Sequence, residues 1–417
     1  MLIRRSSIRP AGFKACTTAV VFLAAALAAL SGGSWPVQAA AFTTKAKQAI
    51  LMDYETGAIL YQKDVDQLVA PASMSKLATL AVVFDRLKKG TLKLDDTFVI
   101  SEHAWRDGGA PSRTSAMFAP LGKPVSVEDL VQGIAIQSGN DASIAVAEGI
   151  AGSDASFAKL MTQYMRGIGL EKSTFANPTG LPHPEQLMTA REIALLAKHL
   201  IAEYPDYYKY FGMQKFPYQP EGRRRPYAFF NRNPLLGSLE GADGLKTGHL
   251  EASGYGLVGS AVQNGQRLIA VVHGLTSREE RKVEAVKLMQ WGFRSFTPYD
   301  LYETDEIVGT ARVWGGDKFY VPLRGKGSVK VLLPKFPLRQ KLTAEIVYKA
   351  PLKPPIKEGE QVAVLRVTSA SNAVNEVPLY AAEEVPEGSL VRKGFDSLIV
   401  MAWRWMADKA SSLLEKI

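Results

Sequence analysis

The sequence contains very little cysteine and histidine. Its one cysteine, Cys16, lies near the start of the chain, and its five histidines show no spacing typical of metal ligands. The chain also has no phosphate-binding P-loop, no internal repeat and no low-complexity tract. These absences exclude a disulfide-stapled fold, and we expect neither a metal nor any other cofactor.

Long apolar runs are scarce as well. One run covers residues 15–30, is short and rich in alanine, and is followed by the small residues of Val37-Gln38-Ala39. Four basic residues precede or open it: Arg4, Arg5, Arg9 and Lys14. This pattern predicts a secretory signal over residues 1–39 and an exported protein, with an uncleaved membrane anchor as the alternative.

The net charge of the predicted mature chain is modest. The leader holds four basic residues and no acidic one, so the formal net charge falls from +9 to +5 (9 − 4 = 5). In an exported protein this suits an anionic lipid or wall polymer better than nucleic acid. We therefore expect no nucleic-acid partner, and we interpret Arg223-Arg224-Arg225 as a solvated loop.

Residues 40–297 show the pattern of an α+β domain. Hairpins are predicted over residues 49–61 and 255–272, and the second contains Asn264-Gly265, a dipeptide that favours a type I′ turn. Helical patterns cover residues 73–88, 127–149, 155–167, 190–201 and 277–293. Hairpins at both ends with helices between them predict one antiparallel sheet flanked by helices.

Residues 298–385 predict a small all-β domain. Leu342, Ala344, Ile346 and Tyr348 alternate with polar residues, which is the period-two pattern of a half-buried strand. Short β segments separated by glycine and proline continue from there. No cluster of residues in this part is typical of catalysis.

The last segment, residues 386–417, predicts an amphipathic helix. Seven apolar residues share one helical face: Phe395, Ile399, Ala402, Met406, Ala410, Leu413 and Ile417. Charged residues interrupt any continuous apolar run, so this helix cannot span a bilayer, while Trp403 and Trp405 suit the headgroup region. We expect it to lie on a membrane surface. The alternative is a helix packed on its own domain or on a partner.

A candidate nucleophile lies at the start of the first helical pattern. In Ser73-Met74-Ser75-Lys76, the first and fourth residues share a helix face, so the hydroxyl and the amine can meet. A serine hydroxyl needs a neighbour that takes its proton, and a lysine does this only when burial or a nearby cation keeps it neutral. This spacing alone is weak, because Ser156-Phe157-Ala158-Lys159 repeats it on what we interpret as an ordinary helix face.

Two further motifs strengthen the prediction. Ser138-Gly139-Asn140 lies at a polar break inside an apolar helical stretch, and Lys246-Thr247-Gly248 directly precedes the second hairpin. In this order the three motifs are the active-site signature of penicillin-binding proteins and serine β-lactamases. By contrast, Gly254-x-Gly256-x-x-Gly259 matches a dinucleotide-binding pattern but precedes a predicted strand, so we reject it.

With these motifs the chain resembles a known family, the low-molecular-mass penicillin-binding D-alanyl-D-alanine carboxypeptidases. The resemblance extends over Pro71-Ala72-Ser73, residues 137–142, residues 243–249 and Trp291-Gly292-Phe293, and it includes the β domain and the tail. It implies a penicillin-binding protein/serine β-lactamase-like domain and an acyl-enzyme mechanism. The implied partners are peptidoglycan pentapeptides as substrates and β-lactam antibiotics as covalent inhibitors. The implied location is the periplasmic face of the inner membrane, with peripheral attachment through the tail.

The resemblance also implies a role for each catalytic residue. Ser73 would attack the penultimate D-alanine and Lys76 would take its proton. Ser138 and Lys246 would pass a proton to the leaving D-alanine, and Lys246 would also keep Lys76 neutral by charge repulsion. Asn140 would orient Lys76 and the substrate amide.

Further residues are implied in substrate binding. The backbone N–H groups of Ser73 and His249 would form the oxyanion hole. Gly248, which lies between Thr247 and His249 in the sequence, is implied in substrate binding as well. Thr247 and Arg281 would bind the terminal carboxylate of the substrate. Arg232 matches another arginine of the family.

One departure from the family concerns the loop of residues 175–181. Thr179 stands where some relatives carry a histidine, and no role is transferred to the nearby His183.

Three alternatives stay open. A class A β-lactamase would carry a deacylating glutamate in the loop of residues 169–189, where Glu171 and Glu185 lack that motif's context. A DD-endopeptidase would share all three motifs, but its relatives usually lack the β domain and the anchor. A non-enzymatic wall scaffold would be expected to have lost Ser73, Lys76 or Lys246.

Overall fold

The computed structural model describes residues 42–335, 342–369, 374–394 and 396. The predicted leader and most of the predicted amphipathic tail therefore lie outside the described residues. Of the tail, residues 390–394 and 396 are helical. Among the helices of the described ranges, none combines the length and the apolarity needed to cross a membrane.

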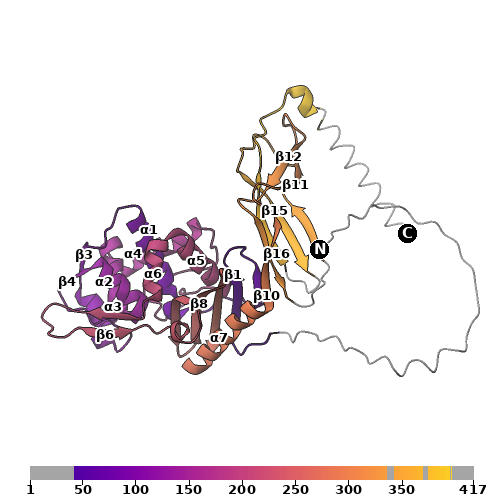
Figure 1. Ribbon diagram of the computed structural model, residues 1–417. Coiled ribbons are helices and arrows are strands. Elements are labelled where there is room, and N and C mark those ends of the chain that lie inside the picture. Colours follow the sequence, from indigo (N-terminus) through magenta and orange to yellow (C-terminus); the bar gives the residue numbers. More distant parts are fainter. Residues whose placement is uncertain (1–41, 336–341, 370–373, 395, 397–417) are drawn as a thin grey trace, which may run out of the picture. The chain divides into compact units, whose positions relative to one another are not determined.

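A five-stranded antiparallel sheet forms the centre of the first part of the chain (Figure 1). Its order is β2 (Ile59–Lys63), β1 (Gln48–Asp53), β9 (Gln266–Leu275), β8 (Gly254–Gln263) and β7 (Ala242–Leu250). Both predicted hairpins are present, and the first pairs with the second through β1 and β9. The prediction of one sheet shared by the two ends of this part is confirmed.

The turn between β8 and β9 shows why the second hairpin forms. Asn264 and Gly265 have φ values of 51° and 77°. Both central residues of a type I′ turn need positive φ, and asparagine and glycine accept this more easily than other residues.

The sheet is covered on both faces, and β1 shows how. All six of its residues are buried. Ile50 and Met52 belong to the core shared with the helical region, whereas Ala49 and Leu51 belong to the core shared with α7 (Arg278–Ser295). Because alternate strand residues point to opposite faces, one apolar strand supplies two cores.

Six α-helices form the helical region. They are α1 (Lys76–Lys88), α2 (Val127–Gln132), α3 (Asn140–Ala151), α4 (Asp154–Gly167), α5 (Ala190–Glu203) and α6 (Pro205–Gly212). The predicted helix over residues 127–149 is broken, as its polar residues suggested. After α2 the chain forms a π-helical turn, η4 (Gly133–Gln137), and Ser138 then adopts a left-handed conformation with φ 64° before α3 begins.

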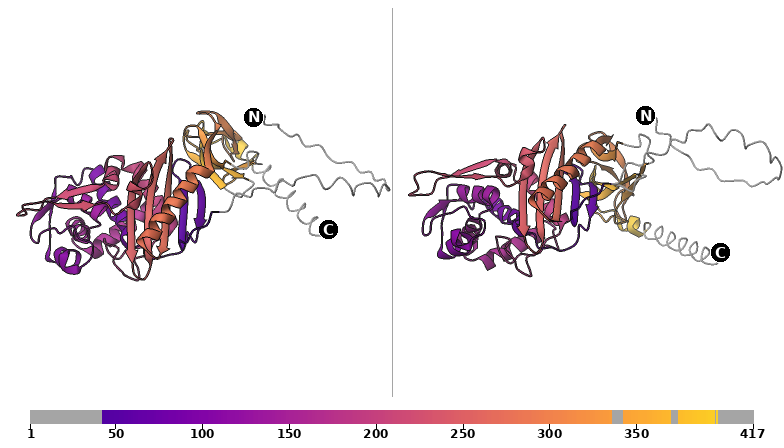
Figure 2. Two further views of the ribbon diagram at one scale, coloured as in Figure 1. Left: turned by 60° about the horizontal axis from the view of Figure 1, so that its bottom comes forward. Right: turned by 90° about the horizontal axis from the view of Figure 1, so that it is seen from below.

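Two small two-stranded antiparallel sheets in this region were not predicted. One pairs β3 (Thr97–Val99) with β4 (Pro124–Ser126). The other pairs β5 (Lys215–Tyr218) with β6 (Tyr227–Phe230), and the three consecutive arginines lie in its connecting loop. Figure 2 shows this second hairpin extending beyond the helices.

The remaining strands form the predicted all-β part. β10 (Phe296–Tyr302) pairs with β13 (Val329–Pro334). A five-stranded sheet has the order β11 (Ile307–Arg312), β12 (Tyr320–Arg324), β16 (Val374–Ala381), β15 (Gln361–Ser369) and β14 (Leu342–Val347). The fold class is confirmed, an α+β domain followed by a small all-β domain. In β14, Leu342 and Ile346 pack on the apolar core as predicted, but Ala344 is exposed because β14 is an edge strand.

Candidate active site

The predicted nucleophile lies in a short 3₁₀ turn, η1 (Ala72–Ser75), that leads into α1. Ser73 is partly exposed there, while Met74 and Ser75 are buried. Ala72 has φ 52°, a left-handed conformation that is unfavourable for a residue with a side chain. Tight packing around Ala72 therefore holds the backbone in the shape that presents the Ser73 hydroxyl.

Lys76 is fully buried, and its amine lies 3.2 Å from Ser73 Oγ. The same amine donates hydrogen bonds to Asn140 Oδ1 at 2.7 Å and to the Thr179 carbonyl oxygen. Burial, and after it the charge of Arg232, lowers the pKa of Lys76 to about 7. A neutral amine has two hydrogens and one lone pair. Because two carbonyl oxygens accept the two hydrogens, the lone pair is left for the Ser73 hydroxyl proton.

The second motif places Asn140 and Ser138 beside this amine. Asn140 begins α3, and its Nδ2 donates to Thr114 Oγ1 at 2.9 Å, which fixes the direction of Oδ1 toward Lys76. Ser138 is buried, and its Oγ has no hydrogen-bond partner among the described residues. A buried hydroxyl without a partner is costly, so this group is available for a ligand or for a proton transfer.

The third motif lies on β7, one of the two edge strands of the sheet. Lys246 is buried, and among the described residues its amine donates only a long hydrogen bond of 3.4 Å, to the Thr247 carbonyl. Burial lowers the pKa of Lys246 well below its usual value, and the nearby charges of Lys76, Arg232 and Arg281 lower it further. For Lys76, burial is a larger cause of the lowered pKa than any neighbouring cation. The charge of Lys246 is therefore not needed to explain a neutral Lys76.

Gly248 explains how β7 comes so close to the nucleophile. A Cβ atom at this position would lie 2.8 Å from the Pro71 carbonyl oxygen and 3.1 Å from the Ala72 Cβ atom. Both distances are shorter than ordinary contacts, so only glycine lets the strand and the 3₁₀ turn pack together. The glycine of the third motif thus has a steric reason.

Three further predicted site residues, Arg281, His249 and Arg232, are basic or carry a basic ring. Arg281, in the first turn of α7, is buried, and its Nε has no hydrogen-bond partner in the described part of the chain. Burial lowers the pKa of Arg281 to about 10, and its guanidinium lies 5.8 Å from the centre of the Tyr255 ring. The His249 ring is exposed and stacks on that same ring at 3.9 Å. Arg232 is exposed and donates to Ser115 Oγ at 2.6 Å.

Several contributors were missed by sequence reasoning. Thr179 contributes a backbone carbonyl and not its side chain. Thr114 lies 26 positions before Asn140, whose side chain it accepts a hydrogen bond from. The Thr179 loop is fixed on α1 because Thr79 Oγ1 donates to the Pro178 carbonyl at 2.8 Å. Thr179 thus contributes its backbone carbonyl to the site. Backbone groups and distant supports leave no signal in a short motif.

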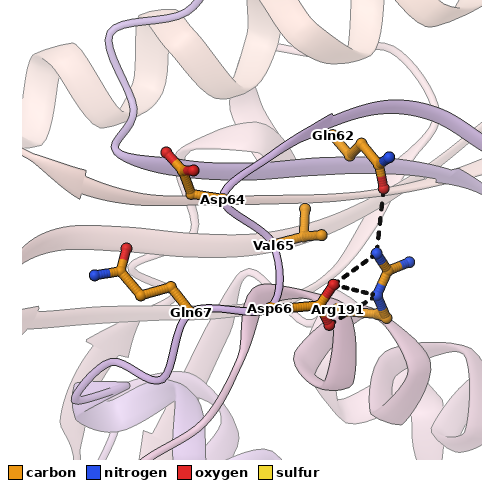
Figure 3. Close-up of a pocket in the computed structure, with 6 residues that line it drawn as sticks. All are labelled: Gln62, Asp64, Val65, Asp66, Gln67 and Arg191. Atoms are coloured by element: carbon orange, nitrogen blue, oxygen red, sulfur yellow. Dashed lines mark hydrogen bonds and ion pairs between the residues drawn. The ribbon is translucent and has the colours of Figure 1, made fainter.

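The rejected patterns do not join the site. Ser156 and Lys159 are both exposed on α4, and the glycines of residues 254–259 lie on strand β8. A shallow surface pocket of about 560 Å³ also lies on other residues: Gln62, Asp64, Val65, Asp66, Gln67 and Arg191 (Figure 3). There Arg191 donates to Asp66 at 2.9 Å and to Gln62 at 3.2 Å, so its charge is already compensated.

Comparison with known proteins agrees with this geometry. A family model described as D-alanyl-D-alanine carboxypeptidase matches residues 36–277. The chain belongs to this family. A second model, described as the C-terminal domain of penicillin-binding protein 5, matches residues 296–387.

Curated relatives and solved structures cover most of the chain. D-alanyl-D-alanine carboxypeptidase DacC of Escherichia coli K12 is 37% identical over 87% of this chain and 90% of its own length. DacA of Haemophilus influenzae is 34% identical over 92% of this chain and 97% of its own length. The crystal structure of penicillin-binding protein 5 from Haemophilus influenzae has a TM-score of 0.70 at 34% identity, covering 83% of this chain and 99% of that one.

These comparisons confirm the predicted family and activity class. The chain is a serine-type D-alanyl-D-alanine carboxypeptidase, a hydrolase of a family that acts on peptidoglycan peptides and binds β-lactams. The roles of the individual residues remain predictions.

Proposed function

We propose that Ser73 carries the acyl group during removal of the terminal D-alanine from peptidoglycan pentapeptides. The neutral Lys76 amine takes the Ser73 proton as Oγ attacks the carbonyl carbon of the penultimate D-alanine. The backbone N–H groups of Ser73 and His249 stabilise the oxyanion. The C–N bond then breaks, and Ser138 and Lys246 deliver a proton to the leaving amino group. Water finally hydrolyses the ester and regenerates the Ser73 hydroxyl.

One observation carries this proposal, the environment of the Lys76 amine. This amine is buried, has a pKa of about 7 and lies 3.2 Å from Ser73 Oγ. It also donates hydrogen bonds to the Asn140 side-chain oxygen and to the Thr179 backbone oxygen. A lysine prepared in this way is a base at neutral pH and not a surface charge. An inactive scaffold would have no reason to retain a buried amine at this energetic cost.

The substrate's terminal carboxylate is proposed to meet Arg281 and Thr247, with Arg232 nearby. Arg281 supports this assignment because its guanidinium is buried and makes no ion pair among the described residues. A buried cation that lacks an anion in the free protein is stabilised when an anionic ligand arrives. β-Lactams carry a carboxylate and a reactive carbonyl, so they would acylate Ser73 by the same steps.

For the organisation of the chain we propose the division that the sequence predicts. We propose a leader over residues 1–39, catalysis within residues 40–297, a β domain over 298–385 and a tail that attaches to the periplasmic face of the inner membrane. Support for the tail comes from its described root, where Leu390 and Val391 are 86% and 84% exposed. Adjacent exposed aliphatic side chains suit a lipid surface.

The test is release of free D-alanine from a pentapeptide ending in D-Ala-D-Ala, with Ser73→Ala as the control. Release by the wild-type chain that disappears in the control is expected. No release, together with labelled penicillin attached at Ser73, would point to endopeptidase work on cross-linked peptides. Absence of both release and labelling would exclude the enzyme and favour a scaffold.

A further inference from the structure

The hairpin β5–β6 concentrates charge that the proposed chemistry does not use. Between residues 213 and 233 the chain has five basic residues and one acid, a net charge of +4 (5 − 1 = 4). They are Lys215, Arg223, Arg224, Arg225, Arg232 and Glu221. The net charge of residues 40–417 is +5, so this hairpin accounts for most of it.

The arginines at the tip of the hairpin are exposed and lack internal counter-ions. Neither Arg224 nor Arg225 makes an ion pair within the described ranges, and the acid of the tip, Glu221, is bound by Lys123 at 3.0 Å. Arg223 lies over the Tyr227 ring, with its guanidinium carbon 3.7 Å from the ring centre. Cations grouped without an acid create a local positive potential that attracts an external anion.

Aromatic rings lie beside these cations. Tyr227 stacks on Phe229 at 5.5 Å and contacts Phe118 at 5.3 Å. Phe118 itself is 39% exposed. The hairpin therefore presents apolar ring faces flanked by positive charge, a combination that suits a ligand with both apolar and acidic groups.

This surface is continuous with the active site. The segment of residues 114–118 contacts both, because Thr114 accepts from Asn140 at 2.9 Å and Phe118 packs on Tyr227. Between these two contacts, Ser115 accepts from Arg232 at 2.6 Å. The hairpin tip is seven residues from Arg232, a reach of at most about 25 Å along an extended strand. Figure 2 shows the hairpin extending past the helices, so a bound polymer could follow it outward.

We propose that this surface is an exosite for the carboxylate-bearing peptide stems of the wall polymer. The exosite comprises Phe118, Arg223, Arg224, Arg225 and Tyr227. It rests on the proposed function, because the polymer bound there is the one whose terminal D-Ala-D-Ala occupies the active site. A wall strand is favoured over a lipid surface because the exosite joins the catalytic residues through residues 114–118. A short peptide is too small to engage both places, whereas a polymer can.

The experiment compares two double variants of the full chain. Arg224→Ser/Arg225→Ser removes two unpaired tip cations, and Lys93→Ser/Lys159→Ser removes two exposed cations elsewhere that also lack ion pairs in the described residues. Binding to purified sacculi, freed of attached phosphate polymers, is measured by sedimentation in a Ser73→Ala background. The thermal midpoint of each variant shows that it is folded.

We expect the arginine variant to bind sacculi about fivefold more weakly at low salt, since each exposed charge contributes modestly, and the lysine variant to bind normally. The difference should shrink with added salt. It should also disappear on sacculi whose carboxyl groups have been amidated. In a Ser73-intact background, the ratio of kcat/KM for soluble wall strands to kcat/KM for a short peptide should fall by a similar factor.

Equal binding by both variants would overturn the exosite. So would a loss confined to phosphatidylglycerol vesicles with sacculus binding intact, because the hairpin would then be a membrane contact. A persisting difference on amidated sacculi would exclude carboxylates as the ligand. Failure of the exosite can be distinguished from failure of the proposed function. In the second case the wild-type chain would release no D-alanine even from the short peptide.

Discussion

The active site and the β domain differ in whether their buried basic side chains form ion pairs. Lys76, Lys246 and Arg281 are buried, and none of them makes an ion pair among the residues described. In the β domain, Arg312 donates to the fully buried Asp396 of the tail at 2.5 Å, and the second oxygen of that carboxylate accepts the Gly315 N–H at 2.8 Å.

This difference indicates which basic residues serve the reaction and which affect the stability of the fold. An unpaired buried cation destabilises a fold, so its presence indicates a group kept for a reaction or a ligand. A buried pair with every oxygen satisfied need not add much stability compared with apolar residues, but removing one partner is costly. Replacing an unpaired buried cation should therefore lower activity and leave stability unchanged or higher. Replacing the paired cation should lower stability and leave activity unchanged.

The largest expected effect is on catalysis at Lys76. Lys76→Met keeps the apolar stem and removes the base, so acylation should fall by about a thousandfold. Because the pKa of Lys76 is lower in the folded than in the unfolded chain, the lysine destabilises the fold below its unfolded pKa of 10.5, and fully so below about 7. At pH 7 the variant should thus be as stable as the wild type or more stable.

The rate of labelling by fluorescent penicillin and the free energy of unfolding measure the two effects. Retained labelling in Lys76→Met would show that another group takes the Ser73 proton. Lost activity with a clearly destabilised fold would instead show that Lys76 stabilises the fold. Lys76 and Arg312 would then not differ in their effect on stability.

The opposite outcome is expected for Arg312→Leu in the β domain. This change leaves Asp396 buried without its cation, so the free energy of unfolding should fall by about 3 kcal/mol. Short-peptide hydrolysis at 25 °C should be retained, because Arg312 contacts no predicted site residue. Arg312→Leu/Asp396→Leu should recover much of the lost stability. A single variant as stable as the wild type would show that water reaches the carboxylate.

A smaller effect tests the close approach of β7. Gly248→Ala places a methyl group within 2.8 Å of a backbone carbonyl, so the strand must shift and acylation should fall by about tenfold to a hundredfold. Gly167→Ala is the matched control, because a Cβ atom there meets nothing within 4 Å. Stopped-flow acylation by penicillin compares the two. Equal rates would show that the third motif tolerates a side chain at its glycine.

Much of the fold and most of the site could be predicted from the sequence, because the signals were local. The i, i+3 spacing of Ser73 and Lys76 and the Asn264-Gly265 turn each depend on a few adjacent residues. The β5–β6 hairpin was missed since its strands are only four residues long and one contains Pro217. The Thr179 carbonyl was missed because every residue has one, and only the folded chain shows which carbonyl meets Lys76.

A pH dependence links the buried cations to the reaction. Lys76 must be neutral to act as a base, so the acylation rate should rise about tenfold per pH unit below its pKa of about 7 and level off above it. Lys246 lies close and its pKa is also lowered, so the rise belongs to the pair of lysines. Arg281, with a pKa of about 10, should lose its charge only in strong base, which predicts weaker carboxylate binding there.

The second-order rate of penicillin acylation between pH 5 and 9 checks this, since the carboxylate of the antibiotic keeps its charge throughout that range. Arg232→Gln provides the finer test. Its charge is the second cause of the lowered pKa of Lys76, after burial, so its removal should move the rise to higher pH by a fraction of a unit. A rate that is flat from pH 5 to 9 would mean that Lys76 is neutral throughout or is not the base.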